Sequence, residues 1–419
     1  MALTTTSAAR RASQLARSLS STAAVEHTLY GFIAGTQQPV ELVSGLGFAE
    51  GPRWCRRRGA LLFSDMPAQC VWQVDGASGV ATIRATSHDY VQNGVATDRP
   101  SGLGALPSGE LLVVAMDSFT VAACHQGGGA SEGCSESQRL VPHANLLPAV
   151  RAHDPAGWAR GEYMLNDAVC DACGNMYVGL DHNGPKDSNG TRASRPSPLF
   201  FVNATSGSVS VAAADTTFAN GCVLEPTGHV DVGVGVNSPR QRLILAETYA
   251  QRITVFDVDL DHNNMGTGAL HNRRVWAELP GIFPDGICLD AEGCLWVGVA
   301  ARDGAAIGHL DLDPGVMELN QGCARPGLGI EGGAPWRGFL RLREGGCVLE
   351  AVQLHAERMA IACVLGGDDG RTLFMLEAFS TNNKVKTIDR SNSRVCSARV
   401  RVPAMLDPSE PRYCAGYYI

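Results

Sequence analysis

The sequence lacks the features that mark several large classes of protein. It contains no run of about 18 consecutive apolar residues, so no segment is predicted to span a bilayer as a helix. Charged residues make up only 18% of the 419 residues, the net charge is −8, and basic residues cluster only in the short run Arg56-Arg57-Arg58. Proteins that bind nucleic acid usually carry a basic surface. We therefore expect neither nucleic acid nor a membrane as a partner.

Cysteine is not scarce, but its spacing indicates neither a disulfide framework nor a complete zinc site. The 14 cysteines are spread along the chain. Cys170 and Cys173 have the spacing of half a zinc knuckle, yet no second close pair and no His-rich partner follows them. Reduced, mostly buried thiols are expected. The motif G-x-S-x-G is also absent and nothing in the sequence provides a base beside Ser101, which argues against a serine nucleophile.

The first 25 residues contain no acidic residue, three arginines and many Ser, Thr and Ala. This composition is typical of an organellar transit peptide, and an ordinary N-terminal segment is the alternative. Residues 1–25 are therefore excluded from the predicted fold, and residues 26–419 are expected to form one domain. The expected location is the cytoplasm, or a mitochondrion or plastid if the first residues are a transit peptide.

One pattern recurs six times along the chain. A small or polar dipeptide is followed by an apolar strand, a polar turn that ends in glycine, and a second apolar strand. The six copies begin at Glu50, Ser101, Asn166, Asn220, Asp285 and Ala362. The turn glycine lies eight residues later in five copies and nine later in the first copy, which gives Gly59, Gly109, Gly174, Gly228, Gly293 and Gly370.

Further strand-like runs follow each copy, so each repeat contains about four short strands and hardly any helical periodicity. This pattern predicts an all-β fold, a six-bladed β-propeller. Inserted loops are expected near 127–158, 230–241 and 300–338, two of them over the mouth of the central channel. The segment His27–Leu46 is expected to supply a strand that closes the ring with the last blade.

The first residue of each repeat is expected to lie at the start of an innermost strand, so that the six face one another around the axis. Five of these residues carry a side-chain oxygen, and Ala362 is the exception. Capping a turn is the alternative role for any one of them. Two carboxylates and two amides that converge in a narrow channel require a cation between them. The residues predicted to hold this divalent metal ion are Glu50, Asn166, Asn220 and Asp285.

Ligation by oxygen atoms alone favours Ca²⁺, Mg²⁺ or Mn²⁺ over a metal that prefers thiolates. Six stretches, in an order that includes the motifs EGP, LND, NG and PDG, carry a resemblance to a known family. They are FAEGPRW (48–54), PSGLGALPSGELLVVAM (100–116), LNDAVCDACGNMYVG (165–179), LILAETYAQRITVFD (243–257), RRVWAELPGIFPDGICLDAEGCLWV (273–297) and LGGDDGRTLFM (365–375). In these stretches the chain resembles the family of gluconolactonases, regucalcin (senescence marker protein) and luciferin-regenerating enzymes.

The resemblance implies a six-bladed propeller that holds calcium or zinc and opens sugar lactones. It implies that Glu50, Asn220 and Asp285 hold the metal, that Asn166 contacts the substrate or the metal, and that Asp285 is also the acid/base. In the sugar-lactonase branch an Arg that holds substrate hydroxyls lies two residues before the Asn of LND, and Met164 stands there in this chain. Specificity for gluconolactone is therefore not implied.

Three further residues are candidates for contact with the substrate: Ser101, Asp181 and His182. Roles in turns are the alternative for Asp181 and His182. The sequence thus predicts a hydrolase in which a metal ion polarises the carbonyl of a small lactone, water attacks, and Asp285 accepts the proton. Three alternatives stay open: a phosphotriesterase-like hydrolase on the same metal site, a calcium-binding regulatory propeller without catalysis, and a protein-interaction scaffold. The sequence does not predict the oligomeric state.

Overall fold

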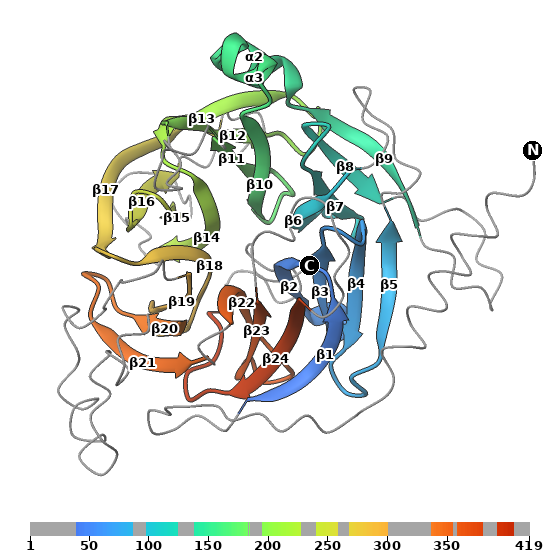
Figure 1. Cartoon of the computed structure of the whole chain (residues 1–419), viewed down its shortest axis with the longest axis vertical. Coiled ribbons are helices and arrows are strands. Elements are labelled where there is room, and N and C mark those ends of the chain that lie inside the picture. Colours follow the sequence, from blue (N-terminus) through green and yellow to red (C-terminus); the bar gives the residue numbers. More distant parts are fainter. Residues whose placement is uncertain are drawn as a thin grey trace, which may run out of the picture.

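The repeat predicts six blades, and six blades are present in the computed structural model. It describes residues 39–86, 98–124, 138–182, 184, 195–227, 240–258, 268–300, 337–354, 358–379 and 392–405. These residues form a ring of antiparallel sheets around a central axis, with four strands in each blade (Figure 1). The prediction of a six-bladed β-propeller is confirmed.

The strands of each blade are numbered from the axis outward. Blade 1 contains β2 (Ala49–Cys55), β3 (Ala60–Asp65), β4 (Cys70–Asp75) and β5 (Ala81–Thr86). Blade 2 contains β6 (Pro100–Ala105), β7 (Leu111–Ala115), β8 (Thr120–Cys124) and β9 (Gln138–Asn145). Blade 3 contains β10 (Tyr163–Cys170), β11 (Met176–His182), β12 (Ser197–Val202) and β13 (Val209–Thr216). Blade 4 contains β14 (Ala219–Thr227), β15 (Arg240–Glu247), β16 (Arg252–Val258) and β17 (Leu270–Glu278).

The last two blades complete the ring. Blade 5 contains β18 (Phe283–Leu289), β19 (Leu295–Ala300), β20 (Gly338–Leu342) and β21 (Val348–Gln353). Blade 6 contains β22 (Met359–Gly366), β23 (Thr372–Ala378), β24 (Ser393–Arg399) and, outermost, β1 (Val40–Leu46). The strand β1 precedes blade 1 in the sequence, so the pairing of β1 with β24 closes the ring. The predicted closure is thereby confirmed for residues 40–46, whereas residues 27–38 lie outside the described residues.

Blades 1 and 2 also join at their outer edges, because β5 and β9 pair in parallel at Ala85↔Gln138 and Thr86↔Arg139.

The range 127–158, predicted to be a loop, includes β9 and the short helix α2 (Leu147–His153), and α3 (Pro155–Ala159) begins inside it. The loop prediction is wrong there. Pro142 obscured the strand pattern in the sequence, and proline is tolerated here because β9 is the outermost strand of its blade. The predicted loops 230–241 and 300–338 lie outside the described residues except at their ends.

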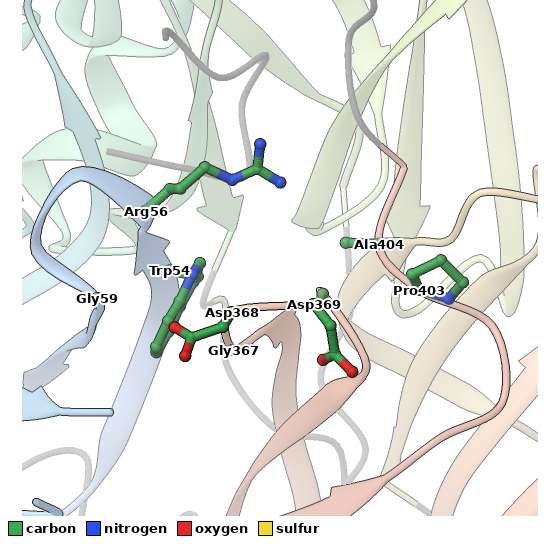
Figure 2. A pocket seen from close by; sticks show the side chains of 9 residues that line it. Trp54, Arg56, Gly59, Gly367, Asp368, Asp369, Pro403 and Ala404 are labelled. Carbon is green, nitrogen blue, oxygen red and sulfur yellow. The ribbon is translucent and has the colours of Figure 1, made fainter. Parts of the chain in front are cut away.

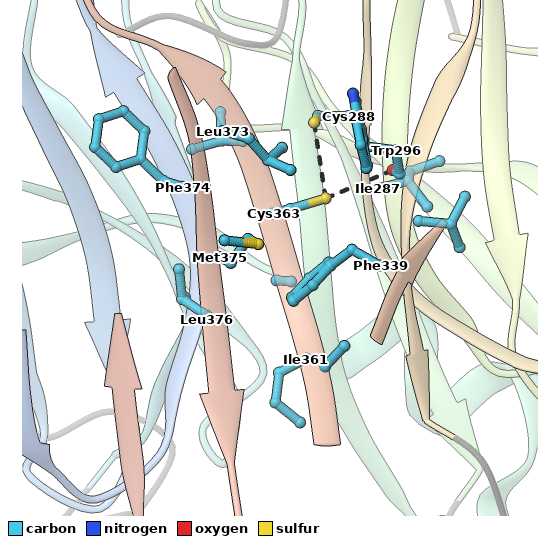
Figure 3. Close-up of a cluster of buried hydrophobic side chains, with 14 of the residues drawn as sticks. Ile287, Cys288, Trp296, Phe339, Ile361, Cys363, Leu373, Phe374, Met375 and Leu376 are labelled. Carbon is cyan, nitrogen blue, oxygen red and sulfur yellow. Dashed lines mark hydrogen bonds between the residues drawn. The ribbon is translucent and has the colours of Figure 1, made fainter. Parts of the chain in front are cut away.

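The hydrophobic core lies between the blades. The second strand of each blade is a nearly continuous apolar run that is buried on both faces, as in β7 (LLVVA) and β3 (ALLFSD). Figure 3 shows the packing between blades 5 and 6, where the Sγ atoms of Cys288 and Cys363 lie 3.7 Å apart.

All cysteines among the described residues are free thiols, and most are buried. Among the helices that the structure describes, none has the length and apolar character needed to cross a membrane.

Candidate functional site

The innermost strand of every blade has one extra residue relative to its neighbour, at the same level of the ring. In blade 1 the pairing passes from Glu50↔Ser64 to Arg53↔Leu62, so three steps along β2 match two along β3. Equivalent irregularities occur in β6, β10, β14, β18 and β22. Such a β-bulge bends the strand and redirects the side chain of the extra residue. In blades 1 to 5 the bulges fall at the positions that the sequence repeat identified.

Five of these positions hold the predicted residues Glu50, Ser101, Asn166, Asn220 and Asp285. Each is buried, and none exposes more than 6% of its surface. In blade 6 the prediction needs a correction, because the pairs Ala360↔Glu377 and Cys363↔Met375 make Ile361 the equivalent residue in place of Ala362. The turn of that blade is one residue longer than its glycine suggested. We call these six residues, with Ile361 as the sixth, the oxygen ring.

Glycine follows the ring residue in four blades, and it is required by the close approach of the next blade. A Cβ on Gly221 would lie 2.6 Å from the carbonyl oxygen of Asp285, and a Cβ on Gly51 would lie 2.7 Å from that of Ser101. Both distances are shorter than real Cβ contacts. The dipeptides EG, SG, NG and DG therefore combine a polar side chain with a small residue that allows neighbouring innermost strands to approach closely.

The two amides of the ring are oriented by acceptors on the protein. Asn166 Nδ2 donates to the carbonyl oxygen of Ala219 (3.3 Å), and Asn220 Nδ2 donates to Thr248 Oγ1 (3.1 Å). The Thr248 hydroxyl donates to the carbonyl oxygen of Pro284 (2.8 Å), so it can only accept from Asn220. Both amide oxygens therefore face away from these bonds. Asn220 Oδ1 is buried and has no hydrogen-bond partner within the described part of the chain.

Sequence reasoning missed Thr248, because its role depends on a contact between blades 4 and 5. An unsatisfied buried amide oxygen is costly, and a bound cation would satisfy it. No group of three or more His, Cys, Asp or Glu side chains suited to a metal occurs among the described residues. The oxygen ring instead offers two carboxylates and two amides, a set of donors suited to a hard divalent ion.

Other acidic residues at this end of the blades have structural roles. Asp65 accepts the backbone N–H groups of Gly47 and Phe48 at 3.2 and 3.0 Å. Glu247 accepts from Arg252 Nε (3.1 Å) and Arg273 (2.9 Å). Burial raises the pKa of Glu247, but these bonds outweigh burial and hold it below its usual range. These carboxylates stabilise the blades and are not available to a metal.

A buried ion pair ties blade 1 to blade 3 beyond the oxygen ring. Arg53 lies 3.3 Å from Asp167 and donates through Nε to the carbonyl oxygen of Leu103 (3.1 Å) and through its terminal amino group to that of Ala168. Burial raises the pKa of Asp167, while Arg53 opposes this shift. Arg53 thus contacts the innermost strands of three consecutive blades, which fixes their relative positions.

Asp181 and His182 lie at the end of β11, one strand away from the oxygen ring. Asp181 pairs with Met164 and His182 with Tyr163, so both lie at the end of blade 3 where Asn166 is found. His182 is buried, its Nε2 lies 3.5 Å from Glu162 Oε2, and its ring lies 5.0 Å from that of Tyr163. Hydrogen bonds from Arg160 lower the pKa of Glu162. The Nε2 atom of His182 therefore faces the carboxylate of Glu162.

A cavity of about 380 Å³ lies at the opposite end of the innermost strands, between the turns of blades 1 and 6 (Figure 2). Trp54, Arg56 and Asp368 line it together with the turn glycines Gly59 and Gly370. The oxygen ring lies at the start of these strands and the cavity at their far end. The cavity therefore does not belong to the predicted site.

Comparison with known proteins agrees with this architecture. The model of a family described as "SMP-30/Gluconolactonase/LRE-like region" matches residues 48–319. The fold is similar to that of a luciferin-regenerating enzyme, with a TM-score of 0.57 and 16% identity over 91% of this chain and 99% of that one. It is also similar to the calcium-binding protein regucalcin of Agrobacterium tumefaciens (TM-score 0.52, 15% identity, 91% and 99% covered). A gluconolactonase of Xanthomonas campestris gives a TM-score of 0.50 at 14% identity, with 89% and 99% covered.

Proposed function

This chain belongs to the SMP-30/gluconolactonase/LRE-like family, and from that premise we propose that it is a metal-dependent hydrolase that opens a small lactone ring. The orientation of Asn220 carries the proposal, because its buried amide oxygen is turned away from Thr248 and lacks a hydrogen-bond partner among the described residues. A gluconolactonase and a calcium-binding regucalcin among the similar structures support it.

Glu50, Asn220 and Asp285 would hold the ion, with Asn166 as a fourth contact to the ion or to the substrate. The carboxylates of Glu50 and Asp285 balance the two charges of one divalent cation. Oxygen ligands suit Ca²⁺ best, and Mg²⁺, Mn²⁺ or Zn²⁺ are further possibilities that metal analysis distinguishes. When bound, the ion would polarise the lactone carbonyl and stabilise the negative charge that develops on its oxygen.

The residues of the chain account for the remaining steps. Asp285 accepts a proton from the attacking water as the new C–O bond forms, and returns it to the ring oxygen as the ester bond breaks. Asn166 and Ser101 orient the substrate, and Asp181 contacts it from blade 3. His182 is the less suitable base, because its Nε2 faces Glu162. Asp285 belongs to the oxygen ring itself, which makes it the favoured proton acceptor.

The test is the metal content of the purified protein, combined with hydrolysis of a panel of lactones and phosphotriesters with and without chelator. We expect one divalent ion per chain and lactone hydrolysis that chelator abolishes and added metal restores. Glu50→Gln serves as the matched variant, since it removes one charge and retains an oxygen. Hydrolysis of phosphotriesters alone would replace the lactonase proposal, and metal binding without any turnover would indicate a regulatory protein.

A further inference from the structure

A second set of residues lies two positions before the oxygen ring in every blade, and we call this set the rim. Its residues precede the oxygen-ring residues by two positions: Phe48, Arg99, Met164, Phe218, Phe283 and Met359. Backbone hydrogen bonds tie rim residues to the residue that follows the second strand of the same blade. Met66 N donates to Phe48 O (3.0 Å), and Thr248 N donates to Phe218 O (3.2 Å). Met164, Phe283 and Met359 lie inside their innermost strands and the other three directly precede theirs, so the rim comes immediately before the oxygen ring along the chain in every blade.

The rim is apolar at five of its six positions. Phe48 is fully buried, whereas Met164, Phe218, Phe283 and Met359 are partly exposed. Arg99 is the exception, and its charge is neutralised by Asp117, whose Oδ2 accepts from Arg99 Nε at 2.8 Å. In blade 3 an acidic residue lies beside the rim, because Asp181 pairs with Met164 across the two inner strands.

Aromatic rings concentrate where the rim adjoins Asn220 and Asp285. The ring of Tyr249 lies 4.7 Å from that of Phe218 and 6.3 Å from that of Phe283, measured between centroids. Phe218 has a φ of +53°, a left-handed conformation that side-chain-bearing residues rarely adopt. This aromatic group lies beside Thr248, the residue that orients Asn220.

A polyhydroxylated substrate would be poorly matched to this rim. Each hydroxyl that leaves water needs a hydrogen-bond partner, and apolar side chains offer none. An alkyl or aryl group gains from the same surroundings, because its surface is removed from water. We infer that the substrate is a lactone with an alkyl or aryl substituent, and that this substituent contacts Phe218, Tyr249 and Phe283. This inference rests on the proposed hydrolase function.

The metal-loaded protein should be assayed with a phenyl-substituted δ-lactone, unsubstituted δ-valerolactone and glucono-δ-lactone. We expect kcat/KM to be at least about 10-fold higher for the phenyl lactone than for gluconolactone. Phe283→Ala should lower kcat/KM for the phenyl lactone by roughly 10- to 100-fold and for valerolactone far less. Phe283→Leu should restore much of the loss. Val275→Ala, on the outermost strand of blade 4, is the control and should change neither substrate.

A preference for gluconolactone, or an equal loss on both lactones in Phe283→Ala, would overturn the inference. The binding of non-hydrolysable lactams with the same substituents separates this result from a failure of the proposed function. If no lactone is hydrolysed but the phenyl lactam binds and Phe283→Ala weakens its binding, the rim is correct and the hydrolase proposal is wrong. If the phenyl lactam does not bind, the rim inference is wrong whatever the turnover.

Discussion

At the scale of a single residue, Asp285 has two proposed roles, metal ligand and proton acceptor, and two substitutions distinguish them. Asp285→Asn keeps an oxygen in the ring but removes a negative charge and the proton acceptor, whereas Asn220→Asp adds charge and leaves Asp285 intact. We expect metal-saturated Asp285→Asn to lose roughly 100- to 10,000-fold in kcat, the usual contribution of a general base. Asn220→Asp should retain turnover and bind metal at least as tightly. Near-normal turnover in Asp285→Asn would make Asp285 a ligand only, and His182 would be the next candidate.

Asp98, near the rim in blade 2, gives a pH dependence that can be measured. It is fully buried, and burial raises its pKa to about 6 even though its Oδ1 accepts the N–H groups of Asp117 and Ser118. Between about pH 4 and 6 the folded state keeps a proton that the unfolded state has lost, so the free energy of unfolding falls as pH rises. The total loss is about 3 kcal/mol.

Asp98→Asn should remove this loss, since the amide keeps one acceptor oxygen and never ionises. The variant should exceed the parent in stability at pH 7 by up to about 3 kcal/mol, and the difference should shrink toward pH 4. Urea unfolding at several pH values measures it. Asp75→Asn is the control of opposite sign, because hydrogen bonds from Ser78 lower the pKa of the partly exposed Asp75 and its charged form stabilises the fold. A difference that does not vary with pH would contradict the assignment.

At the scale of the element, the bulge and the glycine beside it position the oxygen ring. Gly221→Ala would bring a Cβ to 2.6 Å from both Asp285 O and Ile287 N, so β14 and β18 must move apart. We expect a loss of roughly 1–3 kcal/mol in unfolding free energy, together with weaker metal binding. Gly59→Ala, with φ of +58° and no atom within 4 Å of the added Cβ, should cost about 1 kcal/mol and leave metal binding unchanged. Equal metal affinity in both variants would contradict this account.

The sequence predicted what repeats at a fixed spacing and missed what depends on contacts between blades. The distance from ring residue to turn glycine was enough to predict six blades and five oxygen-ring residues. It misplaced the sixth at Ala362, because Ile361 and Ala362 are both apolar and only strand pairing distinguishes them. Thr248 gave no signal, since its hydroxyl bridges two blades. The rim could have been found by reading the repeat two residues earlier.

At the scale of the whole molecule, the ring is closed by strands from the two ends of the described chain. Beyond the pairing of β1 with β24, Asn392 Nδ2 donates to Gly47 O (2.8 Å) and Ala49 N donates to Ser393 Oγ (3.1 Å). The second bond holds the residue directly before Glu50. The closure of the ring and the geometry of the candidate site are therefore coupled through β2.

Val43→Asp tests this coupling, because Val43 in β1 is only 4% exposed and belongs to a core cluster to which blades 1, 4, 5 and 6 contribute. A buried carboxylate without a partner should lower the unfolding free energy by roughly 3 kcal/mol or more, and weaken metal binding as Glu50 loses its support. Val40→Asp is the matched control, since Val40 is 61% exposed in the same strand and should change neither quantity. Thermal unfolding followed by tryptophan fluorescence, with a metal titration of the folded protein, measures both. If Val43→Asp lowered stability and left metal affinity unchanged, the oxygen ring would be held by blades 1 to 5 alone, and the coupling would be wrong.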